Sequence, residues 1–141
     1  MTIDLFEHAK FEIISKLGRI LSRDLKLNNT NTNFINLGCG NSYVNNFINV
    51  DFFGNKMIDY GMDLRFPFKI ESNSIDGIFS EHTFEHLSHQ EVDNALGELY
   101  RILKPEAKIR IIVPDLSILI EKYSSNDDEW FQKWQHLVLK D

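Results

Sequence analysis

The sequence has little of what marks several classes of protein. It contains a single cysteine, Cys39, which excludes an internal disulfide and a thiolate cluster. No apolar run approaches the roughly 18 residues of a membrane-spanning helix, and the first residues lack the apolar stretch of a secretory signal. Basic residues number 15 against 21 acidic ones, a net charge of -6, so no basic surface is expected for a phosphate backbone. These absences predict a cytoplasmic protein that binds neither nucleic acid nor a membrane.

The apolar residues that are present, 43% of 141, suffice for the core of one domain. Apolar residues at helical spacing predict an N-terminal amphipathic helix within residues 1–26. A linker rich in Asn and Thr follows, and an alternation of strands and helices then fills residues 34–115. Residues 116–141 read as two helices, the second with Trp130 and Trp134 on one face. We therefore expect a single domain with a central core and a helical segment at each end.

Short apolar runs predict the strands of that core. An amphipathic helix precedes the last run and stops before Pro105, which cannot continue it. A helix between two apolar runs is typical of a βαβ crossover, so the sheet is expected to be parallel. The five predicted strands are 34–38, 47–51, 56–59, 75–79 and 107–113.

The first predicted strand breaks into the turn Gly38-Cys39-Gly40, and the second ends on Asp51. Glycines let a ligand approach the main chain closely, and a carboxylate ending the adjacent strand can accept two hydrogen bonds from a ribose diol. The pattern favours an adenosine site, although a tight turn without a ligand is the alternative. A nicotinamide dinucleotide is disfavoured, because the turn lacks the third glycine of the pyrophosphate fingerprint.

Several motifs, taken in order, resemble the class I S-adenosylmethionine-dependent methyltransferases, close to the methyltransferase type 11 group. The resemblance implies a Rossmann-like α/β three-layer sandwich with a mostly parallel five-stranded sheet in the order 3-2-1-4-5. It also implies S-adenosyl-L-methionine as cofactor and methyl transfer to a small-molecule or sugar-containing acceptor. The last two strands of the family fold have no counterpart in this sequence. The motifs are 36–41, 48–51, 63–68, 80–87, 103–105 and 109–115.

The same resemblance implies roles for individual residues. Asp51 would hold the ribose hydroxyls, Asp63 would accept from the exocyclic amine of adenine, and the backbone N–H of Leu64 would reach a ring nitrogen. Asn36 stands where many relatives carry an acid for the methionine amino group, so that contact is expected to be weaker. The full set of implied cofactor-binding residues is Asn36, Gly38, Cys39, Gly40, Asp51, Asp63, Leu64, Ser80, Glu81 and His82.

The segment after the fourth strand holds the candidate catalytic groups. An oxygen or nitrogen acceptor would benefit from an imidazole that titrates near neutral pH, which makes His82 the first candidate base and Glu81 the second. His82, Glu85 and His86 also align with a metal-binding pattern of some methyltransferases. A loop that orients the following helix explains Glu85 and His86 equally well, and we predict no metal.

Two further expectations follow from the short C-terminal part. The fifth strand would leave an apolar edge, which a homodimer formed through that edge or through the C-terminal aromatic helix would cover. The missing strands also support a rival function, that of a catalytically incomplete S-adenosylmethionine-binding module that acts within a complex or as a regulator.

Overall fold

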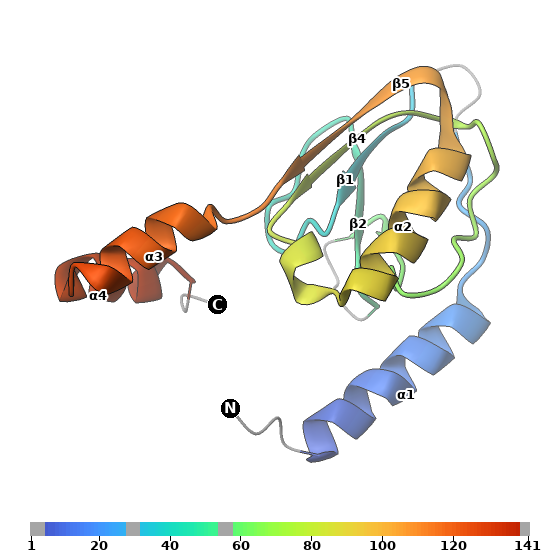
Figure 1. The fold of residues 1–141 in the computed structure, drawn as a ribbon. Coiled ribbons are helices and arrows are strands. Elements are labelled where there is room, and N and C mark those ends of the chain that lie inside the picture. Colours follow the sequence, from blue (N-terminus) through green and yellow to red (C-terminus); the bar gives the residue numbers. More distant parts are fainter. Residues whose placement is uncertain (1–4, 28–31, 54–57, 139–141) are drawn as a thin grey trace.

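The computed structural model describes residues 5–27, 32–53 and 58–138, and it contains one parallel five-stranded sheet in the order β3-β2-β1-β4-β5 (Figure 1). This confirms the predicted Rossmann-like α/β fold and its strand order. The strands are β1 (Phe34–Leu37), β2 (Ile48–Asp51), β3 (Tyr60–Gly61), β4 (Ile75–Glu81) and β5 (Leu103–Ile112). The helices are α1 (Leu5–Leu21), α2 (His89–Ile102), α3 (Leu116–Ser124) and α4 (Asp128–Val138), with a 3₁₀ turn η1 (Phe84–His86) before α2.

The third strand lies later in the chain than the sequence predicts. Residues 56 and 57 of the predicted strand lie outside the described residues, and pairing with β2 begins only at Tyr60, opposite Val50. Just before it, the carboxylate of Asp59 accepts a hydrogen bond from the backbone N–H of Asn49 at 2.8 Å. Because a side chain takes this ladder donor, the strand starts at Tyr60, and the prediction of 56–59 is wrong in its bounds.

The fifth strand begins earlier than predicted. Leu103, directly after α2, pairs with Ile75, and the regular ladder resumes at Lys108 opposite Gly77. Between these points lie Pro105 and Glu106, the latter with a φ of 69°. A proline lacks the N–H of a ladder and is tolerated at an edge strand or a bulge, and β5 is an edge strand with such an irregularity.

Helix α2 covers one face of the sheet and encloses the core with it (Figure 1). Its first turn is fixed by a capping box, in which Ser88 and Glu91 bind each other's backbone N–H groups. Each fully buried aliphatic side chain contributes about 1.5–3 kcal/mol of transfer free energy. Buried residues of the core cluster on β1, β2, β4 and α2 include Ile35, Leu37, Val50, Ile78, Ala95, Leu99 and Ile102.

The chain after β5 leaves the sheet. Helices α3 and α4 project beyond the end of β5, and no residue of α3 is buried (Figure 1). On β5 itself, Ile109 and Ile111 are 36% and 37% exposed. Both predicted C-terminal helices are confirmed, while the side chain of Trp134 lies outside the described residues. Within the ranges described, no helix has the length and apolar character needed to cross a bilayer.

Candidate functional site

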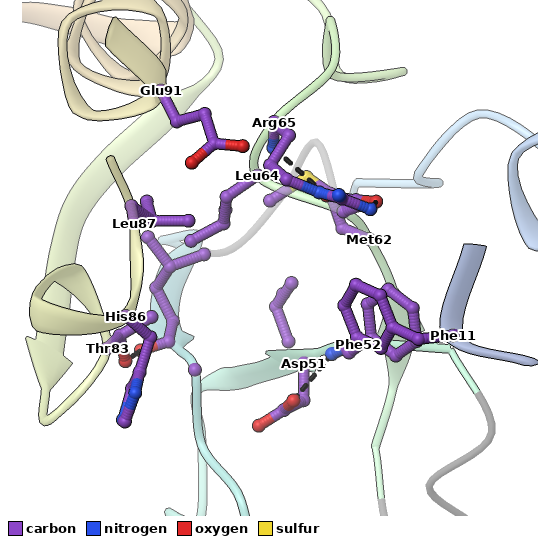
Figure 2. A pocket seen from close by; sticks show the side chains of 14 residues that line it. Phe11, Asp51, Phe52, Met62, Leu64, Arg65, Thr83, His86, Leu87 and Glu91 are labelled. Carbon is purple, nitrogen blue, oxygen red and sulfur yellow. Dashed lines mark hydrogen bonds and ion pairs between the residues drawn. The ribbon is translucent and has the colours of Figure 1, made fainter. Parts of the chain in front are cut away.

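A cavity of about 280 Å³ opens where β1, β2 and β3 end (Figure 2). The carboxyl ends of parallel strands are where open α/β sheets bind ligands. The walls come from α1, from the segments that follow β1, β2, β3 and β4, and from the start of α2. The lining residues are Phe11, Leu37, Gly38, Val50, Asp51, Phe52, Met62, Asp63, Leu64, Arg65, Thr83, His86, Leu87 and Glu91.

The two glycines of the turn after β1 have different roles. Gly38 and Gly40 both have positive φ, 68° and 50°. A Cβ on Gly38 would overlap Oγ1 of Thr83, so this glycine permits close packing inside the protein. A Cβ on Gly40 would meet nothing within 4 Å, so this side of the turn faces open space. Cys39 between them is 5% exposed, and burial, helped by the charge of Asp51, raises the pKa of its thiol.

Asp51 ends β2 with its carboxylate at the cavity (Figure 2). Its Oδ2 accepts a hydrogen bond from the N–H of Gly40 and its Oδ1 accepts one from the N–H of Phe52, both at 2.5 Å. A carboxylate has about four lone-pair sites, so about two remain for a ligand. The side chain is thus held in place and can still accept two hydroxyl groups, as the ribose of S-adenosylmethionine requires.

Asp63 is 5% exposed, and its carboxylate is fully engaged within the protein. Oδ1 accepts from the backbone N and from Nε of Arg65, each at 3.0 Å. Oδ2 accepts from Nη2 of Arg65 at 2.8 Å and from Oγ of Ser15 at 2.5 Å. Burial opposes ionisation of Asp63, but these hydrogen bonds outweigh it and lower its pKa. Because Arg65 also binds Glu12 at 2.6 Å, the cluster joins α1 to the segment after β3.

Helix α1 also supplies an aromatic wall. Phe11 stacks on Phe52 with ring centroids 4.2 Å apart and an interplanar angle of 9°. The guanidinium of Arg65 lies over Phe11, 5.0 Å from the ring centroid. Sequence reasoning missed this wall, since Phe11 lies in the N-terminal helix and its spacing says nothing about which loop it meets. Figure 2 shows both rings on one side of the cavity.

Asn36 lies in β1 and is 3% exposed. Its Nδ2 donates to the carbonyl oxygen of Ser42 at 2.8 Å and to Oδ1 of Asn49 at 2.9 Å. Asn49 in turn donates to the carbonyl oxygens of Val44 and Phe47, both at 3.1 Å. The two amides therefore hold the loop between β1 and β2.

The residues that end β4 and the residue after it, Ser80, Glu81 and His82, do not line the cavity. Ser80 is fully buried, and its Oγ finds no hydrogen-bond partner in the described part of the protein. The backbone of His82 has a φ of 52°. Its side chain is 63% exposed and places Nδ1 3.1 Å from Oε1 of Glu85. His86 lines the cavity instead. Among the described residues no group of three or more His, Cys, Asp or Glu side chains is arranged to hold a metal ion.

The structure thus brings together part of the predicted set. Gly38, Asp51, Asp63 and Leu64 line the cavity. The other predicted residues are not among its lining residues. They are Asn36, Cys39, Gly40, Ser80, Glu81 and His82.

Comparison with known proteins agrees with this geometry. Residues 60–111, from β3 to β5, match the family model of a methyltransferase domain. None of the curated proteins compared with the chain matches it significantly. Members of the matched family use S-adenosylmethionine as methyl donor. The free acceptor sites of Asp51 at the cavity fit that cofactor. The sequence match and the strand order 3-2-1-4-5 together support a class I S-adenosylmethionine-dependent methyltransferase.

Proposed function

We propose that the protein binds S-adenosylmethionine in the cavity at the ends of β1–β3 and methylates a small-molecule or sugar-containing acceptor in the cytoplasm. The observation that carries the proposal is Asp51, which faces the cavity with about two acceptor sites unused beside the open Gly40 turn. The sugar-containing acceptor rests on the family resemblance alone. When bound, the cofactor supplies an activated methyl group on its sulfonium.

The residues of this chain then have to bind the cofactor, orient the acceptor and exclude water. Asp51 holds the ribose, and the stacked pair Phe11 and Phe52 shields one side of the cavity from solvent. Residues 34–115 supply the binding core, and α1 completes its wall. The remaining cofactor contacts of the predicted set, at Cys39, Ser80, Glu81 and His82, stay part of this proposal.

An acceptor that must lose a proton needs a base. We keep His82 as the first candidate and Glu81 as the second. His86 becomes a third candidate because it lines the cavity. Single replacements by Ala of His82 and His86, assayed on one acceptor across pH, distinguish them. The base is the histidine whose loss lowers turnover and removes the pH dependence near neutrality.

The cofactor assignment is tested by titration calorimetry with S-adenosylhomocysteine. We expect the wild-type protein to bind it and Asp51→Ala to lose about tenfold or more in affinity, the size of a lost charge-assisted hydrogen bond. Asp93→Ala, at an exposed position of α2, is the matched control and should bind as the wild type does. Unchanged affinity of Asp51→Ala would refute the assignment.

A second function, that of a binding module without its own catalysis, is favoured by one observation. The predicted bases Glu81 and His82 do not line the cavity. Transfer of a labelled methyl group to fractionated small-molecule extracts separates the two functions. Binding of S-adenosylhomocysteine without any transfer, in the presence of a range of acceptors, would favour the module.

We also propose that two copies associate through the edge of β5 or through the C-terminal aromatic helix α4. Ile109 and Ile111 on β5 are exposed to 36% and 37%. Sedimentation should show a dimer, and Ile111→Lys should shift it to a monomer. A wild-type protein that sediments only as a monomer would contradict this association.

A further inference from the structure

Asp63, the acidic group that the family pattern assigns to the adenine amine, has its carboxylate occupied by groups of the protein itself. All four hydrogen bonds to the Asp63 carboxylate come from Ser15 and Arg65, which is about the number that a carboxylate can accept. Its side chain is 3% exposed, so little of it is available to a ligand. An amine placed here would have to displace a guanidinium or a hydroxyl group.

Glu91 offers the free oxygen that Asp63 lacks. It lies in the first turn of α2 and lines the same cavity. Its Oε2 accepts from the N–H and from Oγ of Ser88, both at 2.7 Å. Its Oε1 makes no hydrogen bond with any of the described residues, and Figure 2 shows the Glu91 carboxylate near Arg65 and Leu64. This is the end of the cavity where the segment after β3 would meet the base, opposite Asp51.

The charge on Glu91 is secured by its surroundings. The hydrogen bonds from Ser88 and the positive charge of Arg65 lower the pKa of Glu91, and together they outweigh burial and the negative charge of Asp63, which raise it. The carboxylate is therefore ionised at neutral pH, and one oxygen is fixed by the helix cap while the other stays available. An acceptor held in this way is suited to an N–H donor such as an exocyclic amine.

We propose that Glu91 is the specificity residue that accepts the exocyclic amine of the cofactor, and that Asp63 is a positioning residue that holds Arg65 and α1 against the cavity. This inference rests on the proposed cofactor. It predicts that the protein distinguishes an amine from a carbonyl at position 6 of the purine through Glu91. Replacement of Asp63 would then weaken every ligand alike, because it loosens the wall that α1 provides.

The test compares S-adenosylhomocysteine with S-inosylhomocysteine, in which a carbonyl replaces the amine, by titration calorimetry. Glu91→Gln keeps the capping box, because the Gln carbonyl can still accept from Ser88. Its NH₂ group then points to the cavity and opposes an amine. We expect Glu91→Gln to lower the preference for the adenosyl ligand about 10- to 100-fold, as expected for a charged hydrogen bond. This preference is the ratio of the affinities for the two ligands. Other effects of a substitution, which act on both ligands alike, cancel in this ratio.

Two matched variants complete the experiment. Glu98→Gln makes the same chemical change elsewhere on α2, at a carboxylate that binds Arg101 and does not line the cavity, and it should leave the ratio unchanged. Asp63→Asn should weaken both ligands by a similar factor and also speed trypsin cleavage within α1. A ratio that falls in Asp63→Asn but not in Glu91→Gln would overturn the inference while leaving the proposed cofactor intact. Failure of the wild-type protein to bind either ligand would overturn both.

Discussion

Replacing Gly38 by alanine should destabilise the protein far more than the same change at Gly40. Both positions have positive φ, so each alanine pays about 1–2 kcal/mol of backbone strain. Only at Gly38 would the new Cβ overlap the side chain of Thr83. Moving Thr83 breaks its 3.1 Å hydrogen bond to the carbonyl oxygen of Glu81, about 1 kcal/mol, and crowding adds about 1–3 kcal/mol. We expect the free energy of unfolding to fall by about 3–6 kcal/mol for Gly38→Ala and by about 1–2 kcal/mol for Gly40→Ala.

The assay is urea unfolding followed by circular dichroism, applied to a double-mutant cycle. Thr83→Ala removes both Oγ1 and Cγ2, and Cγ2 would lie 2.6 Å from the new Cβ of residue 38. It keeps the Cβ of residue 83, which would lie 2.8 Å from that new Cβ. The rescue of Gly38→Ala by Thr83→Ala should therefore be partial, with a coupling free energy of about 1–2 kcal/mol. Gly40→Ala should show no coupling with Thr83→Ala.

In contrast to stability, the affinity for ligand should depend on the residue at position 40. Because the N–H of Gly40 holds the carboxylate of Asp51 and the positive φ of Gly40 is strained for alanine, Gly40→Ala should lower the affinity for S-adenosylhomocysteine at a small cost in stability. Equal destabilisation by both alanines, or a coupling free energy of zero between Gly38→Ala and Thr83→Ala, would refute the division of roles between the two glycines.

Three other perturbations have clear expected outcomes. Ser88→Ala removes the N-cap of α2 and should lower the free energy of unfolding by about 1 kcal/mol, measured in urea. Phe11→Ala should lose the stacking energy with Phe52, about 0.5–1.5 kcal/mol, and should weaken S-adenosylhomocysteine binding in calorimetry. The pKa values of Asp63 and Glu98 are lowered by folding, so their contribution is present above the unfolded values and is lost as pH falls through the folded ones. Acid unfolding should therefore begin below about pH 4, and a stability that rises on acidification there would contradict this.

The parts of the fold that sequence reasoning predicted well are those with a local signal. The strands β1, β2 and β4 are short apolar runs, and the Gly38 turn and Asp51 mark the ends of two of them. The apolar residues of α2 recur at helical spacing, and its capping box can be recognised in the sequence as Ser88 followed three residues later by Glu91. At these places the local propensity, the spacing of apolar residues and the turn residues all favour the same secondary structure.

Other features depend on partners far apart in the chain. The contact of Ser15 with Asp63 spans 48 residues, and that of Glu12 with Arg65 spans 53, so no spacing rule predicts either. The orientation of His82 follows from a positive φ in a residue that rarely adopts one, which an apolar pattern does not reveal. β3 pairs through two residues only, too few for a period to be read.

The asparagine at position 36 is better explained by the loop above it than by the cofactor. No helix is assigned between β1 and β2, so the carbonyl groups of the intervening loop need donors from elsewhere. Asn36 and Asn49 provide them, and the Nδ2 of Asn36 faces two acceptors, the Ser42 carbonyl oxygen and Oδ1 of Asn49. An aspartate here would set a buried negative charge against both acceptors with no proton to donate. The acid that the family resemblance leads us to expect at position 36 is thus incompatible with this loop, and the two amides instead hold the carbonyl groups of Ser42, Val44 and Phe47.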